Sequence, residues 1–229
     1  MMPRIVVFVL AMLLIGAFTS TQAQQGLNEV RCERDPNNPD QSWVAYEAKC
    51  LSELKGLAFR NGHILKLKLE NVKFKTFQDR PCDRYDSGTC STYAVAGYRP
   101  AQNLFIVEQS YFEDSTFWLV SSRSGDMTGL GGTMPEFSPS GRWLVSVDAD
   151  DMNGVEYDVE IWSVGPGKLE RKLAYSSKSK SYESWEFAGW DGDGRIKLKV
   201  ASGEHDGVVE TDAVLTEQGW KLNWPKPEQ

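Results

Sequence analysis

The sequence predicts a mainly β fold with one N-terminal helix, and three observations lead to this fold class. One early segment has the apolar spacing of an amphipathic helix, and the segment after it alternates apolar with polar residues. From residue 91 onward, three stretches repeat the same order of aromatic residue, turn and apolar strand. A period near 3.6 indicates a helix, and a period of two indicates a half-buried strand. We expect residues 24–229 to form one β-rich domain around a sizeable core.

The first 23 residues have the layout of a secretory signal peptide. Arg4 provides a positive start, an apolar run of about a dozen residues follows, and Thr21 and Ala23 are the small side chains before the expected cleavage site. The run is too short to cross a bilayer comfortably as a permanent helix. We therefore expect a periplasmic or secreted protein without permanent membrane insertion, cleaved near Ala23. An uncleaved N-terminal anchor is the alternative.

The charge balance narrows the range of partners. The chain has 25 basic and 32 acidic residues and a net charge of −7, and Arg4 is the only charged residue in the predicted signal peptide, so cleavage would leave −8. Binding to nucleic acid needs concentrated lysine and arginine to meet the phosphates. Nucleic acid is therefore not an expected partner.

The cysteine content fits an oxidising compartment. The four cysteines are Cys32, Cys50, Cys82 and Cys90. An even number in an exported chain indicates disulfides, and four cysteines allow three pairings. We favour Cys32 with Cys50 and Cys82 with Cys90, because each pair is local. Since the spacings match no zinc pattern, no metal centre is assigned to these cysteines.

The helix and the first strands are expected between residues 41 and 79. Trp43, Tyr46, Cys50 and Leu54 share one face of a helix at about 41–55. A hairpin is expected at about 63–79, where leucines alternate with lysines and the phase shifts at Glu70-Asn71, the expected turn. Its lysines are expected on the solvated face and its apolar residues, Phe74 included, on the other.

The three repeats are expected at about 91–130, 133–175 and 184–224. Each begins with an aromatic residue before a polar turn and continues with a strand, a second turn and a last short strand. Four strands in about 40 residues match the size of one propeller blade. The expected fold is a small or incomplete β-propeller-like repeat domain, with a β-sandwich as the alternative.

The middle repeat also resembles a known group. The stretch "FSPSGRWLVSV" followed by "VEIWSV" resembles the repeat of TolB-type and WD-repeat β-propellers, most closely over residues 135–165. The matched stretch has Ser140 where that repeat usually has aspartate, and residues 135–165 contain no Gly-His or Trp-Asp signature. The resemblance implies a propeller-like fold that presents a binding surface. It carries over no catalytic residue.

No catalytic motif stands out, so candidate sites are restricted to loops and aromatic residues. There is no nucleophile elbow, metalloprotease motif, phosphate-binding glycine loop or dinucleotide fingerprint. The expected binding loop follows the best strand and contains Asp148, Asp150, Asp151 and Asn153. Such oxygens suit Ca²⁺, but their spacing does not match an EF-hand, and an ordinary acidic connection is the favoured interpretation. No cofactor is expected.

Two tryptophans near strand ends, Trp185 and Trp190, are candidate exposed aromatics that could stack on a sugar or anchor a protein. Packing in the core is the favoured interpretation for both. The leading hypothesis is an exported, non-enzymatic β-repeat protein that binds a protein or envelope component through its loops. The alternatives are a carbohydrate-active hydrolase that uses loop carboxylates and an exported inhibitor or immunity-type protein.

Overall fold

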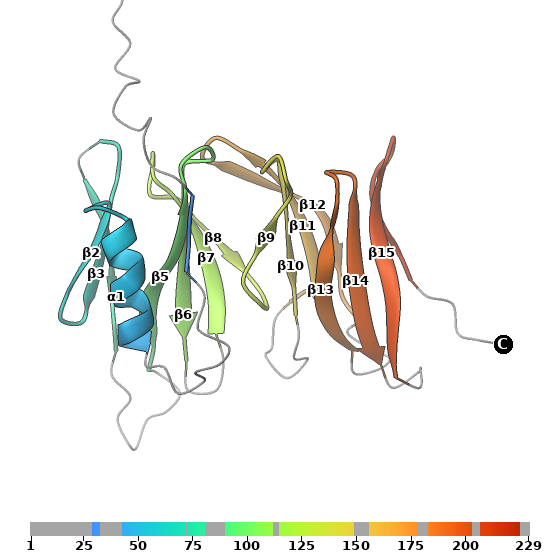
Figure 1. Ribbon diagram of the computed structural model, residues 1–229, viewed down its shortest axis with the longest axis horizontal. Coiled ribbons are helices and arrows are strands. Elements are labelled where there is room, and N and C mark those ends of the chain that lie inside the picture. Colours follow the sequence, from blue (N-terminus) through green and yellow to red (C-terminus); the bar gives the residue numbers. More distant parts are fainter. Residues whose placement is uncertain are drawn as a thin grey trace, which may run out of the picture.

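The computed structural model describes residues 29–32, 43–71, 73–80, 90–111, 115–148, 156–177, 183–202 and 207–224. The predicted signal peptide lies outside these residues. Within them the fold is mainly β, as predicted, with four antiparallel sheets and one short helix, α1 (Trp43–Glu53). Figure 1 shows the sheets side by side in chain order, with α1 beside the first two.

The helix forms where the apolar spacing predicts it. Tyr46, Cys50 and Leu54 are buried on one of its faces. The predicted disulfide Cys32–Cys50 is confirmed, with the two Cα atoms 5.7 Å apart. It joins α1 to the residue that follows the short strand β1 (Val30–Arg31). Cys90 is buried and disulfide-bonded, and Cys82 lies outside the described residues.

The first sheet contains the predicted hairpin and one further strand. Its order is β2-β3-β4, with strands β2 (Ala58–Asn61), β3 (Ile64–Lys68) and β4 (Phe74–Gln78). Leu65 pairs with Phe77, and both point into the core. The expectation that Phe74 faces inward is wrong. Phe74 pairs with Lys68 on the outer face and is 47% exposed.

The second sheet has the order β1-β5-β6-β7-β8. Apart from β1, its strands come from the first repeat: β5 (Thr92–Arg99), β6 (Leu104–Ser110), β7 (Ser115–Ser121) and β8 (Met127–Leu130). Consecutive strands are neighbours, which is the meander that short turns between antiparallel strands produce.

The third and fourth sheets are meanders of the same kind. The third consists of β9 (Glu136–Phe137), β10 (Trp143–Val147), β11 (Val159–Gly165) and β12 (Lys168–Tyr175). The fourth consists of β13 (Glu183–Asp191), β14 (Arg195–Ser202), β15 (Val208–Thr216) and β16 (Gly219–Asn223). The residues of each predicted repeat therefore lie in one sheet.

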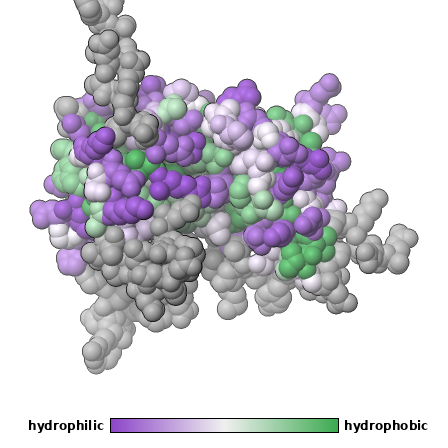
Figure 2. All heavy atoms as spheres, viewed as in Figure 1, coloured by the Kyte–Doolittle hydropathy of each residue, from purple (hydrophilic) through white to green (hydrophobic). Residues whose placement is uncertain are grey.

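Strand β10 of the third sheet is buried on both faces, which explains its nearly continuous apolar sequence, WLVSV. Side chains alternate between the faces of a strand. Leu144 belongs to the core shared with the second sheet, whereas Val145 and Ile161 belong to the core shared with the fourth. The first and fourth sheets lie at opposite ends of the row in Figure 1. In Figure 2, hydrophilic side chains cover much of the described surface in the same view.

Candidate functional site

A cavity of about 860 Å³ lies where the first and second sheets meet. Residues of β4, β5, β6 and β8 line it, together with residues next to these strands. Its lining is a mixture of aromatic, amide, hydroxyl and sulfur side chains with one guanidinium: Thr76, Phe77, Gln78, Arg80, Cys90, Ser91, Tyr93, Gln109, Tyr111 and Met127. The volume falls within the usual range for small-molecule sites, about 300–1,000 Å³.

A buried ion cluster beside the cavity holds its wall in place. Arg60 of β2 donates hydrogen bonds to Glu47 of α1, one of them at 3.0 Å, and to Asp79 at 2.7 Å. The carboxylates are almost inaccessible, with Glu47 1% and Asp79 4% exposed. Because removing charged groups from water is unfavourable unless they are paired, these three residues keep α1 and the end of the first sheet in one arrangement.

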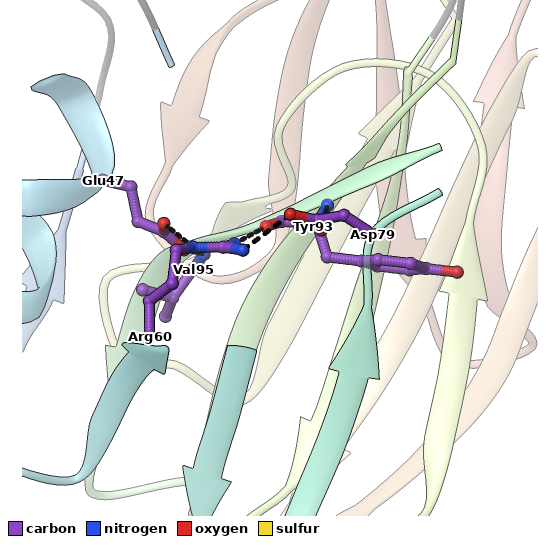
Figure 3. Close-up of polar contacts among 5 residues, drawn as sticks. All are labelled: Glu47, Arg60, Asp79, Tyr93 and Val95. Atoms are coloured by element: carbon purple, nitrogen blue, oxygen red, sulfur yellow. Dashed lines mark hydrogen bonds and ion pairs between the residues drawn. The ribbon is translucent and has the colours of Figure 1, made fainter. Parts of the chain in front are cut away.

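The same cluster fixes the backbone of β5 (Figure 3). Arg60 donates a hydrogen bond to the Tyr93 carbonyl, and Asp79 accepts one from the Tyr93 N–H at 2.9 Å. Glu47 accepts another from the Val95 N–H at 3.2 Å. Figure 3 shows the Tyr93 ring pointing away from the Arg60 guanidinium, and the residue lines the cavity. The ion cluster therefore positions an aromatic side chain of the candidate site.

The remaining side chains give the cavity both apolar and polar character. The Tyr93 ring contacts Phe77, with ring centroids 5.1 Å apart. Gln109 accepts a hydrogen bond from Trp118 Nε1 at 2.8 Å, which orients its amide. Tyr111 is 44% exposed. This combination suits a ligand that has an apolar face and several hydrogen-bonding groups.

The described lining of this cavity contains none of the side chains that most often carry out acid–base catalysis. None of the described lining residues carries a carboxylate or an imidazole, and Cys90 is held in a disulfide. General acid and base catalysis needs a side chain that exchanges a proton near the working pH, most often histidine, aspartate or glutamate. The described cavity wall lacks all three of these.

A second cavity, of about 810 Å³, lies on the fourth sheet and does contain carboxylates, at Glu186, Glu210 and Asp212. Lys199 pairs with Glu186 at 3.1 Å, and Arg195 donates a hydrogen bond to Asp212 at 2.7 Å. The hydrogen bond from Asn223 and the pairing with Arg195 hold the pKa of Asp212 below its ordinary value. A carboxyl group held ionised in this way is poorly suited to act as a general acid.

Of the acidic loop predicted from the sequence, only Asp148 is a described residue, and it lies between the third and fourth sheets. Asp148 is buried; its N–H donates to the Asp158 carbonyl and its carbonyl accepts from the Trp185 N–H. It thus joins the two sheets. Asp150, Asp151 and Asn153 lie outside the described residues, and the described part of the chain contains no cluster of three potential metal-binding side chains.

Trp185 is not an exposed aromatic, because β13 turns this residue toward the third sheet. Trp185 is 0% exposed, donates from Nε1 to Glu183 at 3.1 Å, and contacts the rings of Tyr175 and Trp224. Trp190 is partly buried and packs on the same core, with its ring 6.0 Å from that of Trp220. Both residues therefore pack in or against the core, which is the interpretation favoured from the sequence.

No sequence motif marks the residues around the cavity. The clearest sequence signal for a buried ion pair is Arg60, a charged residue of a short strand. It lies on the same side of that strand as the buried Ala58, where a charged side chain needs a partner. Among the described helices, none has the length and apolar character required to cross a membrane. Comparison of the chain with known protein family models, and with curated proteins, finds no match.

Proposed function

We propose that this chain is an exported, non-enzymatic β-repeat protein that binds a protein segment or an envelope component in the cavity between its first and second sheets. The observation that carries this proposal is the composition of the cavity wall, which has aromatic, amide and guanidinium groups and no described carboxylate or imidazole. The disulfide Cys32–Cys50 supports export, because such bonds persist in oxidising compartments.

We also propose that the four sheets are the blades of an incomplete β-propeller. Three of them are antiparallel meanders of consecutive strands, and the sheets follow one another in a row. Propeller blades are four-stranded antiparallel sheets of this kind. The proposal predicts that an experimental structure shows successive sheets rotated in one direction about a common axis. Sheets paired face to face in two layers would instead identify the β-sandwich.

The binding proposal is tested by blocking the cavity. The protein is expressed from its full sequence, immobilised, and used to capture components of envelope extracts. Thr76 is an exposed residue of β4 that lines the cavity, so Thr76→Trp places a large side chain at its wall. Lys221→Trp adds the same side chain at an exposed position of β16 and serves as the control.

The expected result is a component that the parent protein and Lys221→Trp retain and that Thr76→Trp loses. Capture that is equal for all three proteins, or no capture by any of them, would contradict the proposal. Both variants must show the far-UV circular dichroism of the parent, so that loss of capture reports on the cavity and not on unfolding.

A further inference from the structure

The cavity contains a positive charge that no described residue neutralises. Arg80 follows β4, lines the cavity and is exposed. Its backbone pairs with Ser91, but its side chain forms no hydrogen bond or ion pair with a described residue. The neighbouring carboxylate, Asp79, is already bound to Arg60 and to the Tyr93 N–H. A guanidinium in this state is suited to bind a carboxylate through two parallel hydrogen bonds.

A buried amide adds directed hydrogen-bond donors to the same cavity. Gln109 is only 7% exposed, and its Oε1 accepts the hydrogen bond from Trp118 Nε1 at 2.8 Å. The Nε2 group forms no hydrogen bond with a described residue. Because Gln109 lines the cavity, its N–H groups are available to donate to an acceptor there.

The aromatic residues favour a ligand with flat apolar faces. Tyr111 is 44% exposed and the backbone of Tyr93 is held by the ion cluster, so two amphipathic rings lie at the cavity. Tyrosine rings combine an apolar face with a polar edge, which matches sugar rings, whose C–H faces are apolar and whose edges carry hydroxyl groups. Gln78 and Thr76 add further polar groups to the wall.

From this combination we infer that the cavity binds an acidic saccharide, with Arg80 and Gln109 meeting a carboxylate and Tyr93 and Tyr111 meeting the sugar rings. The inference rests on the proposed function, and it names the ligand class for the same cavity. It also gives a reason for a guanidinium in the cavity wall of a chain whose net charge is −7, because a local positive charge favours anion binding on an acidic protein.

The test compares acidic saccharides with neutral saccharides that have the same rings. Tetragalacturonate and tetramannuronate are titrated into the full-length protein by isothermal calorimetry, each beside its carboxyl-reduced form, which has the same rings without the charge. Tetraglutamate supplies carboxylates on a peptide. We expect at least one acidic saccharide to bind at least about tenfold more tightly than its carboxyl-reduced form and than the peptide, the size of one charge-assisted contact.

Two variants locate the contact. Arg80→Gln removes the charge, and Gln109→Glu keeps an acceptor for Trp118 Nε1 but replaces the donors with a carboxylate. Each is expected to weaken binding of the acidic saccharide at least about tenfold. Arg123→Gln removes an arginine that is outside the cavity lining and paired with Glu70, and it should bind like the parent.

The inference is overturned if neither acidic saccharide binds at millimolar concentration, if the carboxyl-reduced forms or the peptide bind equally well, or if Arg80→Gln binds like the parent. In each of these cases the proposed function still stands when Thr76→Trp abolishes capture of an envelope component. The proposed function fails separately, when Thr76→Trp captures the envelope component as well as the parent does. The failure of the inference and the failure of the proposed function are therefore distinguishable.

Discussion

Replacing Arg60 by methionine is expected to destabilise the fold strongly. The methionine side chain has similar length but no charge, so the buried side chains of Glu47 and Asp79, each 2% exposed, would lose their cationic partner. Removing one partner of a buried ion pair lowers the free energy of unfolding by about 3–5 kcal/mol, because the burial of the remaining charge is no longer compensated by an opposite charge. We expect a loss in this range for Arg60→Met.

The matched control is Arg195→Met, which breaks an ion pair with Asp212 in which the arginine side chain is 53% exposed. Such surface pairs contribute about 0–1 kcal/mol. Both variants are unfolded in urea at pH 7 with disulfides intact, and unfolding is followed by tryptophan fluorescence. Adding Glu47→Gln and Asp79→Asn to Arg60→Met should restore part of the loss, since the buried groups are then neutral. If Arg60→Met is destabilised no more than the control, the assigned role of the ion cluster is wrong.

Three further predictions concern the third and fourth sheets. Gly132→Ala should destabilise more than Gly192→Ala, although both residues have positive φ, because only at Gly132 would the new Cβ lie 2.0 Å from the Val147 carbonyl oxygen; equal urea midpoints would contradict this. Trp185→Ala removes a fully buried ring and should lower the free energy of unfolding by about 3–5 kcal/mol in the same assay; a loss below about 1 kcal/mol would show that the ring is not packed as described. Burial raises the pKa of Glu160, so its charged form opposes folding once the pH exceeds the ordinary glutamate value of 4.5. Glu160→Gln should therefore gain stability relative to the parent between about pH 4 and pH 7, and a difference that stays constant or falls over that range would refute the assignment.

Local patterns located most of the regular structure. The three- and four-residue spacing around Cys50 corresponds to α1, and the alternation in "WLVSV" corresponds to β10, an internal strand of the third sheet. These predictions succeed because the period of buried residues depends on the geometry of one element alone. The disulfide Cys32–Cys50 was also predictable, since its two cysteines are close in the sequence.

The orientation of individual side chains was harder to predict. Phe74 was assigned to the inner face from the alternation beside it, but pairing of Leu65 with Phe77 places it outside. A shift of one residue in register moves every side chain of a strand to the opposite face. Trp185 lies near the start of a strand, where its exposure depends on the third sheet packed against it.

By itself, the sequence determined the mainly β class, the position of the helix, the Cys32–Cys50 disulfide and the three stretches that become successive sheets, because each depends on neighbouring residues or on a short repeat. Only the tertiary structure decided where a ligand could bind. Arg60, Glu47 and Asp79 come from separate segments, and Arg80 and Gln109 meet at one cavity across two sheets. Taken singly, each of these residues is typical of a protein surface. Their burial and mutual distances follow from how the sheets pack.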